Sequence, residues 1–170
     1  MHQKKVRGIK RKSEQMIQRI EEATADFPTE SYNGYWHLHL PASQSFIDSE
    51  KTPIAVKRRC MQTLLDQAAH LKRLKPLDDE IYRVVVLIEL PSLWGSQIII
   101  FKGDSHFTGF FERNNEDQQW IPLPKNRNLL KEWQLTAEDG SSYLGFKEIL
   151  SDEEAEYYHE GELWFIGDLE

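Results

Sequence analysis

Residues 81–102 read IYRVVVLIELPSLWGSQIIIFK and predict a β-hairpin at the centre of the fold. The first arm, Ile81–Leu90, is rich in β-branched residues and apolar at successive positions, which is typical of a strand buried on both faces. Residues 91–96 contain Pro and Gly and indicate a loop, and Gln97–Lys102 again has a strand pattern. We therefore expect a central strand paired with the strand that follows it.

Two amphipathic helices are predicted before this hairpin. Apolar residues recur at helical spacing from about Ile9 to Thr24, and Phe27-Pro28 ends that pattern. In a second helix we expect Thr52 as the N-cap, Pro53 as the first residue and Pro76 beyond the end. The apolar face of this helix would consist of Ile54, Met61, Leu64, Leu65, Ala68 and Leu71.

Three more strands are expected outside the hairpin. Tyr35–Leu40 follows an Asn-Gly turn signal and precedes a proline, while Tyr143–Leu150 and Glu162–Leu169 are separated by an acidic connection. Asn128–Leu135 is compatible with a short helix. These elements predict an α+β fold, a mainly antiparallel sheet of about five strands with two main helices on one face.

Length and composition set the general class of protein. The 170 residues suit a single α+β domain, in which residues 1–26 form a basic N-terminal helix and residues 35–170 the helix-and-sheet body. The longest unbroken apolar run, Val84–Ile88, is far too short to span a membrane, and no apolar stretch follows the basic N-terminus as in a secretory signal. A single cysteine, Cys60, favours a reducing cytoplasm and is expected to be a buried structural thiol.

Charge is unevenly distributed along the chain, whose net charge is −7. Residues 1–19 carry seven Lys or Arg against Glu14, and residues 138–170 carry eleven acids against Lys147. The basic end can contact phosphates or a membrane, pair loosely with the acidic end, or simply solvate a helix. Because the bulk of the chain is acidic, we expect neither a nucleic-acid nor a membrane partner.

The first candidate site is a pair of histidines. His37 and His39 stand at positions i and i+2 of a predicted strand, so both imidazoles should project from the same face. Such a pair can bind zinc or act as acid and base, although zinc requires a third ligand. Candidate third ligands are Glu89, Asp104, His106 and His159. The alternative is a half-exposed strand whose polar face carries two histidines without a chemical role, and no cofactor is expected.

His106-Phe107-Thr108 extends the catalytic interpretation. This tripeptide resembles one half of the paired His-x-Thr/Ser motif of the 2H phosphoesterases, which hold a phosphate between two histidines and two hydroxyls. On this hypothesis His37 and His106 would act as acid and base, and His39 and Thr108 would bind the phosphate or a metal. In His37-Leu38-His39, however, a histidine stands where that family has a hydroxyl.

Aromatic and acidic residues form the candidate binding surface. Trp94, Phe110 and Trp120 lie in segments with loop composition, where they can anchor a partner or close an open face of the sheet. The connection between the last two strands would supply an acidic recognition edge, which consists of Asp152, Glu153, Glu154 and Glu156.

Three further stretches resemble a family of small cytosolic proteins from spore-forming Gram-positive bacteria, known only as a domain of unknown function. They are residues 27–41, Ile98–Ser105 and Gly161–Gly167. The resemblance implies a bacterial, cytoplasmic protein and brings no activity or catalytic residue. Our leading hypothesis is a non-catalytic, immunity- or antitoxin-like module that binds a basic protein partner. The alternative is a histidine-dependent phosphodiesterase or metal-dependent hydrolase.

Overall fold

The computed structural model describes residues 8–28, 35–42, 52–76, 78–90, 93, 95–103, 120–121, 129–137, 142–147 and 161–169. In these ranges the protein has the predicted α+β class. The helices are α1 (Ile9–Ala23), α3 (Ile54–Arg73) and α5 (Leu129–Glu132). The strands are β1 (Tyr35–His39), β2 (Tyr82–Leu90), β3 (Gln97–Lys102), β4 (Trp120–Ile121), β5 (Ser142–Lys147) and β6 (Gly161–Leu169).

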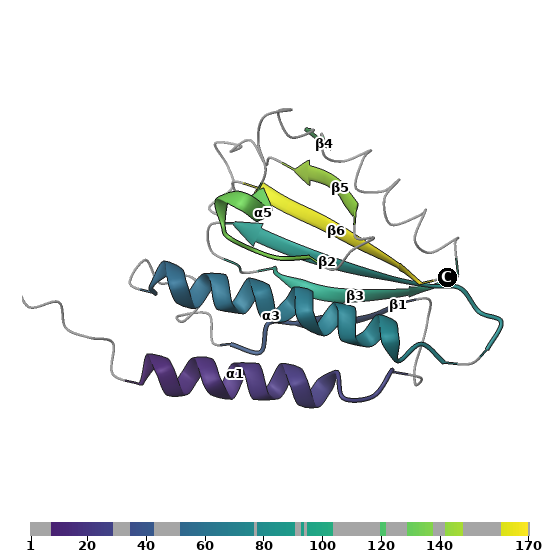
Figure 1. Cartoon of the computed structure of the whole chain (residues 1–170), viewed down its shortest axis with the longest axis horizontal. Coiled ribbons are helices and arrows are strands. Elements are labelled where there is room, and N and C mark those ends of the chain that lie inside the picture. The colour runs from purple at the N-terminus through teal and green to yellow at the C-terminus, as the bar shows by residue number, and fades with distance from the viewer. Residues whose placement is uncertain are drawn as a thin grey trace, which may run out of the picture.

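The described strands form one antiparallel sheet with the order β1-β3-β2-β6-β5-β4 (Figure 1). The predicted hairpin is confirmed, because β2 and β3 are antiparallel neighbours that pair Val85 with Ile99. On its other side β2 pairs with β6, so it is a central strand, as its apolar character predicts. The prediction of about five strands does not include β4, because a strand of two residues is too short to show periodicity.

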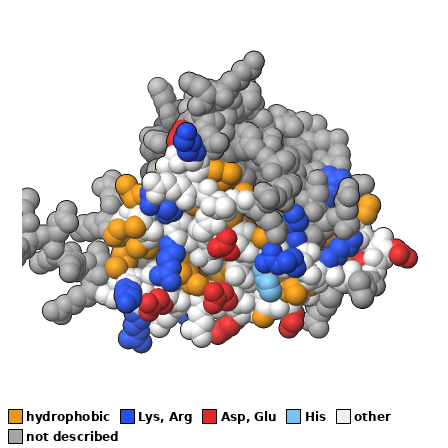
Figure 2. All heavy atoms as spheres, viewed as in Figure 1, with side chains coloured by type: hydrophobic (Ala, Val, Ile, Leu, Met, Phe, Trp, Pro, Cys, Tyr) orange, Lys and Arg blue, Asp and Glu red, His pale blue; other side chains and the backbone are white. Residues whose placement is uncertain are grey.

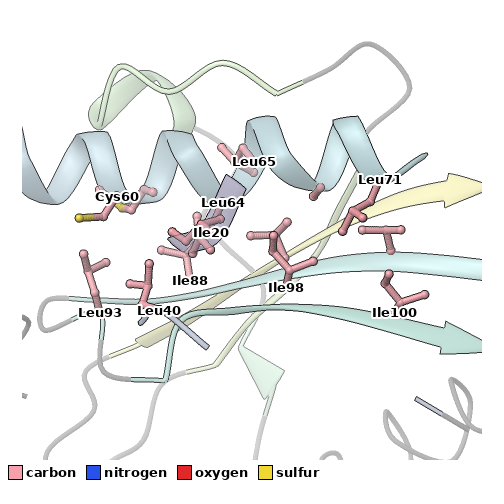
Figure 3. Packing of buried hydrophobic residues seen from close by; sticks show 14 of the residues in the cluster. Ile20, Leu40, Cys60, Leu64, Leu65, Leu71, Ile88, Leu93, Ile98 and Ile100 are labelled. Carbon is pink, nitrogen blue, oxygen red and sulfur yellow. The ribbon is translucent and has the colours of Figure 1, made fainter. Parts of the chain in front are cut away.

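The helices lie on one face of this sheet (Figure 1). Helix α3 contacts β2, β3 and β6, and α1 packs along α3. Figure 3 shows side chains of α3 pointing at those of the sheet, with Leu64 above Ile88 and Leu71 above Ile100. These four side chains are fully buried. At about 25 cal/mol for each Å² of apolar surface removed from water, this layer contact is a main source of stability.

The second helix begins one residue later than predicted. Pro53 occupies the N-cap position with φ −59° and ψ 144°, and no side chain caps the helix. The assignment of Thr52 as N-cap is therefore wrong, because the extended backbone of Pro53 starts the helix at Ile54. The prediction that Ile54 belongs to the apolar face is also wrong, since 62% of this residue is exposed. It lies in the first turn, where α3 extends past the ends of β2 and β3 (Figure 1).

The face of the sheet opposite the helices is apolar as well. Alternate residues of β2 and β3 point away from α3, and four of them are buried: Val85, Leu87, Ile99 and Phe101. These four do not belong to the core cluster beneath the helices. The hairpin therefore contributes to two buried layers, which is the physical reason for its unbroken apolar sequence.

The loop between β2 and β3 is anchored by an apolar side chain. Leu93 has a positive φ of 64°, a region that side chains other than glycine seldom adopt, and it is only 2% exposed. Its carbonyl accepts a hydrogen bond from the N–H of Ser96 at 3.1 Å. Figure 3 shows Leu93 beneath Cys60 of α3. Burial of the leucine offsets the cost of its backbone conformation.

Cys60 is a buried thiol, as predicted. It is 2% exposed, and its Sγ donates to the Sδ of Met16 in α1 at 3.7 Å. Desolvation is the main cause that raises the pKa of Cys60 to about 11; a backbone hydrogen bond and the charge of Arg59 oppose it. The thiolate, which is the reactive form, is therefore scarce at neutral pH.

We expect Cys60 to be inert toward a thiol reagent in the folded protein. With a pKa of about 11, only about one thiol in a thousand is ionised at pH 8, and burial blocks access as well. Absorbance after addition of 5,5′-dithiobis(2-nitrobenzoate) should rise slowly in buffer and rapidly in urea. Rapid reaction without denaturant would contradict the packing of Cys60 against Met16.

Candidate functional site

Strand β1 positions the two histidines at one margin of the sheet. In its register with β3, His37 lies opposite Ile99 and His39 opposite Gln97. The alternate residues Trp36 and Leu38 pack against the core beneath the helices. Both histidines are exposed. They therefore project from the opposite face of the sheet, as the i and i+2 spacing predicts.

The two imidazoles lie next to each other. Their ring centroids are 4.9 Å apart and the planes meet at 68°, an edge-to-face arrangement. The pKa of His39 is lowered from its usual value of 6.5, first by partial burial and second by the neighbouring His37. His39 is therefore largely neutral at neutral pH. A neutral imidazole can accept a proton or bind a metal ion.

We expect a titration by NMR to show a pKa below 6.5 for His39. Replacing His37 by Gln should raise this pKa only in part, because burial is the larger cause and persists. Folding favours the neutral ring of His39. Between the lowered pKa of the folded protein and the ordinary value of 6.5, the unfolded chain therefore binds the proton more readily. Stability should therefore fall as the pH drops through 6.5, and His39→Gln should remove that share of the loss. A pKa at or above 6.5 would contradict the arrangement.

A metal would need more than these two rings. Zinc usually takes three or four protein ligands, and β1 supplies two. Among the described residues, no three His, Cys, Asp or Glu side chains are grouped so as to hold a metal. The side chains of Glu89, Asp104, His106 and His159 lie outside the described part of the chain. Zinc binding by His37 and His39 remains a prediction.

Most of the other candidates also lie outside the described residues. This holds for His106 and Thr108, for the aromatics Trp94 and Phe110, and for the recognition edge of Asp152, Glu153, Glu154 and Glu156. The backbone of Trp120 forms part of β4, paired with Lys147 of β5, and its side chain is not described. Whether His106 lies near His37 thus stays a prediction. The same holds for whether the aromatic residues anchor a partner or close an open face of the sheet.

The structure also shows a charged cluster that is not among the sites predicted from the sequence. Lys57, Arg58 and Arg59 stand near the beginning of α3, a helix without an acidic residue in its first turn. Acidic side chains are the favoured ones there, because the helix dipole is positive at that end. Three consecutive cations close to a helix start are the signal that could have marked this cluster in the sequence.

No described helix is both long and apolar enough to cross a bilayer. Comparison with known proteins gave no match among curated proteins or solved structures. A model of a family described as proteins of unknown function, DUF3916, matches residues 17–168. That range includes α3, the second half of α1 and the described strands, except Leu169 at the end of β6. This supports the expected uncharacterised family, and the chain belongs to the DUF3916 family of proteins of unknown function.

Proposed function

We propose that this protein is a non-catalytic binding module that holds a basic protein partner, in the manner of an immunity protein or antitoxin. The observation that carries the proposal is the segregation of charge. Residues 77–170 contain twenty acids and seven Lys or Arg, a net charge of −13, whereas residues 1–76 have a net charge of +6. An acidic surface accelerates association with a cationic partner and makes it dependent on salt.

The described residues support this separation. Residues 52–76, which contain α3, carry six Lys or Arg and one Asp. Along the chain, the cations of α3 are thus separated from the acids of the C-terminal half. In the described part of that half, Asp78, Asp79 and Glu80 are exposed, and Glu80 pairs with Lys102 at 3.7 Å on the surface. The acidic recognition edge belongs to residues 151–160, between β5 and β6 in the sequence.

The proposal is tested with a labelled oligolysine peptide and the full chain. We expect binding that weakens as salt rises, and about a tenfold loss of affinity when Asp152, Glu153 and Glu154 are all changed to Lys. The matched control changes Asp78, Asp79 and Glu80 to Lys, which alters the net charge equally, and should cost about twofold or less. Equal losses in both variants would reject the recognition edge, and no binding at low salt would reject the module.

The enzymatic alternative rests on one observation, the adjacent and exposed imidazoles of His37 and His39. It predicts hydrolysis of bis(p-nitrophenyl) phosphate by the purified chain, abolished in both His37→Ala and His106→Ala with the fold retained. Stoichiometric zinc that is lost in His39→Ala would favour the hydrolase with a metal. Hydrolysis that persists in both alanine variants would eliminate the histidine mechanism.

A further inference from the structure

Helices α1 and α3 run in the same direction, so both begin at one end of the molecule (Figure 1). Two contacts establish this alignment. Cys60 of α3 donates to Met16 of α1. Thr24, eight residues after Met16, donates its hydroxyl to the side-chain oxygen of Gln67, seven residues after Cys60, at 2.7 Å. The first turn of α1 is therefore placed beside the first turns of α3.

This shared end carries a group of cations, which we name the helix-end patch. Its residues are Lys10, Arg11 and Lys12 of α1 and Lys57, Arg58 and Arg59 of α3. The three residues of α1 and Arg59 are exposed. Figure 2 shows Lys and Arg side chains over the ends where both helices begin, with hydrophobic and acidic atoms beside them.

The helix-end patch is electrostatically unfavourable in isolation. Each helix dipole is positive at its start, and neither helix has an acidic residue in its first turn. Within the described chain, Lys10, Arg11, Lys12, Arg58 and Arg59 form no ion pair. The buried Nε of Arg58 has no hydrogen-bond partner either. Five like charges at two positive helix ends, with no ion pair in the described part of the chain, indicate a surface that is stabilised by a bound anion.

We propose that the helix-end patch binds an acidic segment of a partner protein that also carries an apolar side chain. The apolar requirement comes from Ile54, which is 62% exposed and stands one helical turn before Arg58 on the same side of α3. An extended polyanion such as duplex DNA or an anionic membrane would be repelled by the chain as a whole, whose net charge is −7. A short acidic segment meets the cations without that repulsion, so charge complementarity favours it.

The probe is a fluorescent, glutamate-rich peptide with one central leucine, titrated with the full chain. We expect salt-sensitive binding that weakens about tenfold in the triple variant Lys57→Glu, Arg58→Glu, Arg59→Glu. The matched control is Lys72→Glu, Arg73→Glu, Lys75→Glu, which changes the charge by the same amount at the opposite end of α3 and should cost about twofold or less. Equal losses in the two variants would overturn the proposal.

A second variant separates binding from folding. Changing Lys10, Arg11 and Lys12 to Glu places acids where the dipole of α1 favours them, so the melting temperature should stay equal or rise while peptide affinity falls. Ile54→Ser should weaken binding of the leucine peptide and leave an all-glutamate peptide unaffected. These variants should keep their affinity for oligolysine. Loss of binding to the glutamate-rich peptide can therefore be distinguished from loss of the binding to a basic partner that the proposed function requires.

Two further probes test the class of partner. Vesicles of phosphatidylglycerol and a single-stranded DNA oligonucleotide should bind more weakly than the leucine peptide at the same ionic strength, because each presents negative charge over a larger area. Tighter binding to either probe, lost in the Lys57–Arg59 variant, would overturn the assignment of an acidic protein segment.

Discussion

Leu64→Ala should lower the free energy of unfolding by about 3 kcal/mol, because it deletes a fully buried side chain between α3 and the sheet. The loss combines the lost burial of the leucine with the cavity that remains. Ile54→Ala is the matched control on the same helix. The sequence places both residues on one apolar face, yet 62% of Ile54 is exposed. We expect this control to change stability by less than about 0.5 kcal/mol.

Urea denaturation followed by circular dichroism measures both variants. The difference between Leu64→Ala and Ile54→Ala is the quantity of interest, since both remove apolar carbon atoms from one helix. Comparable losses would mean that Ile54 is covered in solution. A loss below about 1 kcal/mol for Leu64→Ala would contradict the packing of α3 on the sheet.

Phe101→Ala should destabilise the protein by about 3–5 kcal/mol, although Phe101 points away from the helices. Its position follows from the register, in which Phe101 is opposite Arg83 of β2 and Tyr35 of β1, while Ile100 faces the helix layer. Only 1% of Phe101 is exposed. This prediction therefore tests whether the second face of the sheet is a genuine buried layer.

The control for Phe101 is His39→Ala, on the same face but at the exposed margin of the sheet. At a pH above 6.5 the histidine variant should change stability by less than about 0.5 kcal/mol, because its ring is exposed and neutral. If Phe101→Ala cost as little as His39→Ala, the second face would be open to solvent. Urea titrations of both proteins decide between these outcomes.

The two buried faces bear on the histidine pair as well. His37 is opposite Ile99, which is 3% exposed, so the imidazoles lie at the boundary between a buried layer and solvent. That position accounts for the dominant effect of burial on the pKa of His39.

The proposed module and the helix-end patch divide the molecule by charge. The acidic half would hold a basic partner, and the beginnings of α1 and α3 would hold an acidic one. Because salt screens exposed charges over about 8–10 Å, both interactions should weaken with ionic strength. The variants separate them, since each triple substitution alters one surface and leaves the other unchanged.

Much of the local structure could be predicted from the residues alone. The period of the apolar residues determined α1 and α3 to within a residue or two, and it identified the β2–β3 hairpin and the common face of His37 and His39. These features depend on neighbours in the sequence. Backbone geometry converts such short-range patterns directly into faces of a helix or strand.

Other features required contacts between distant segments. Pairing of β6 with β2, and the parallel alignment that brings Lys10 of α1 beside the beginning of α3, do not follow from any local period. The positive φ of Leu93 is likewise tolerated because its side chain enters the core beneath Cys60.

The sequence by itself determined the class of fold, the central hairpin, the buried thiol and the shared orientation of the two histidines. Only the tertiary structure decided that Ile54 is exposed while Leu64 is buried, and that the cations of α1 and α3 share one end. The reason is that periodicity specifies which side of an element is apolar. How far that side is covered depends on where the neighbouring elements end.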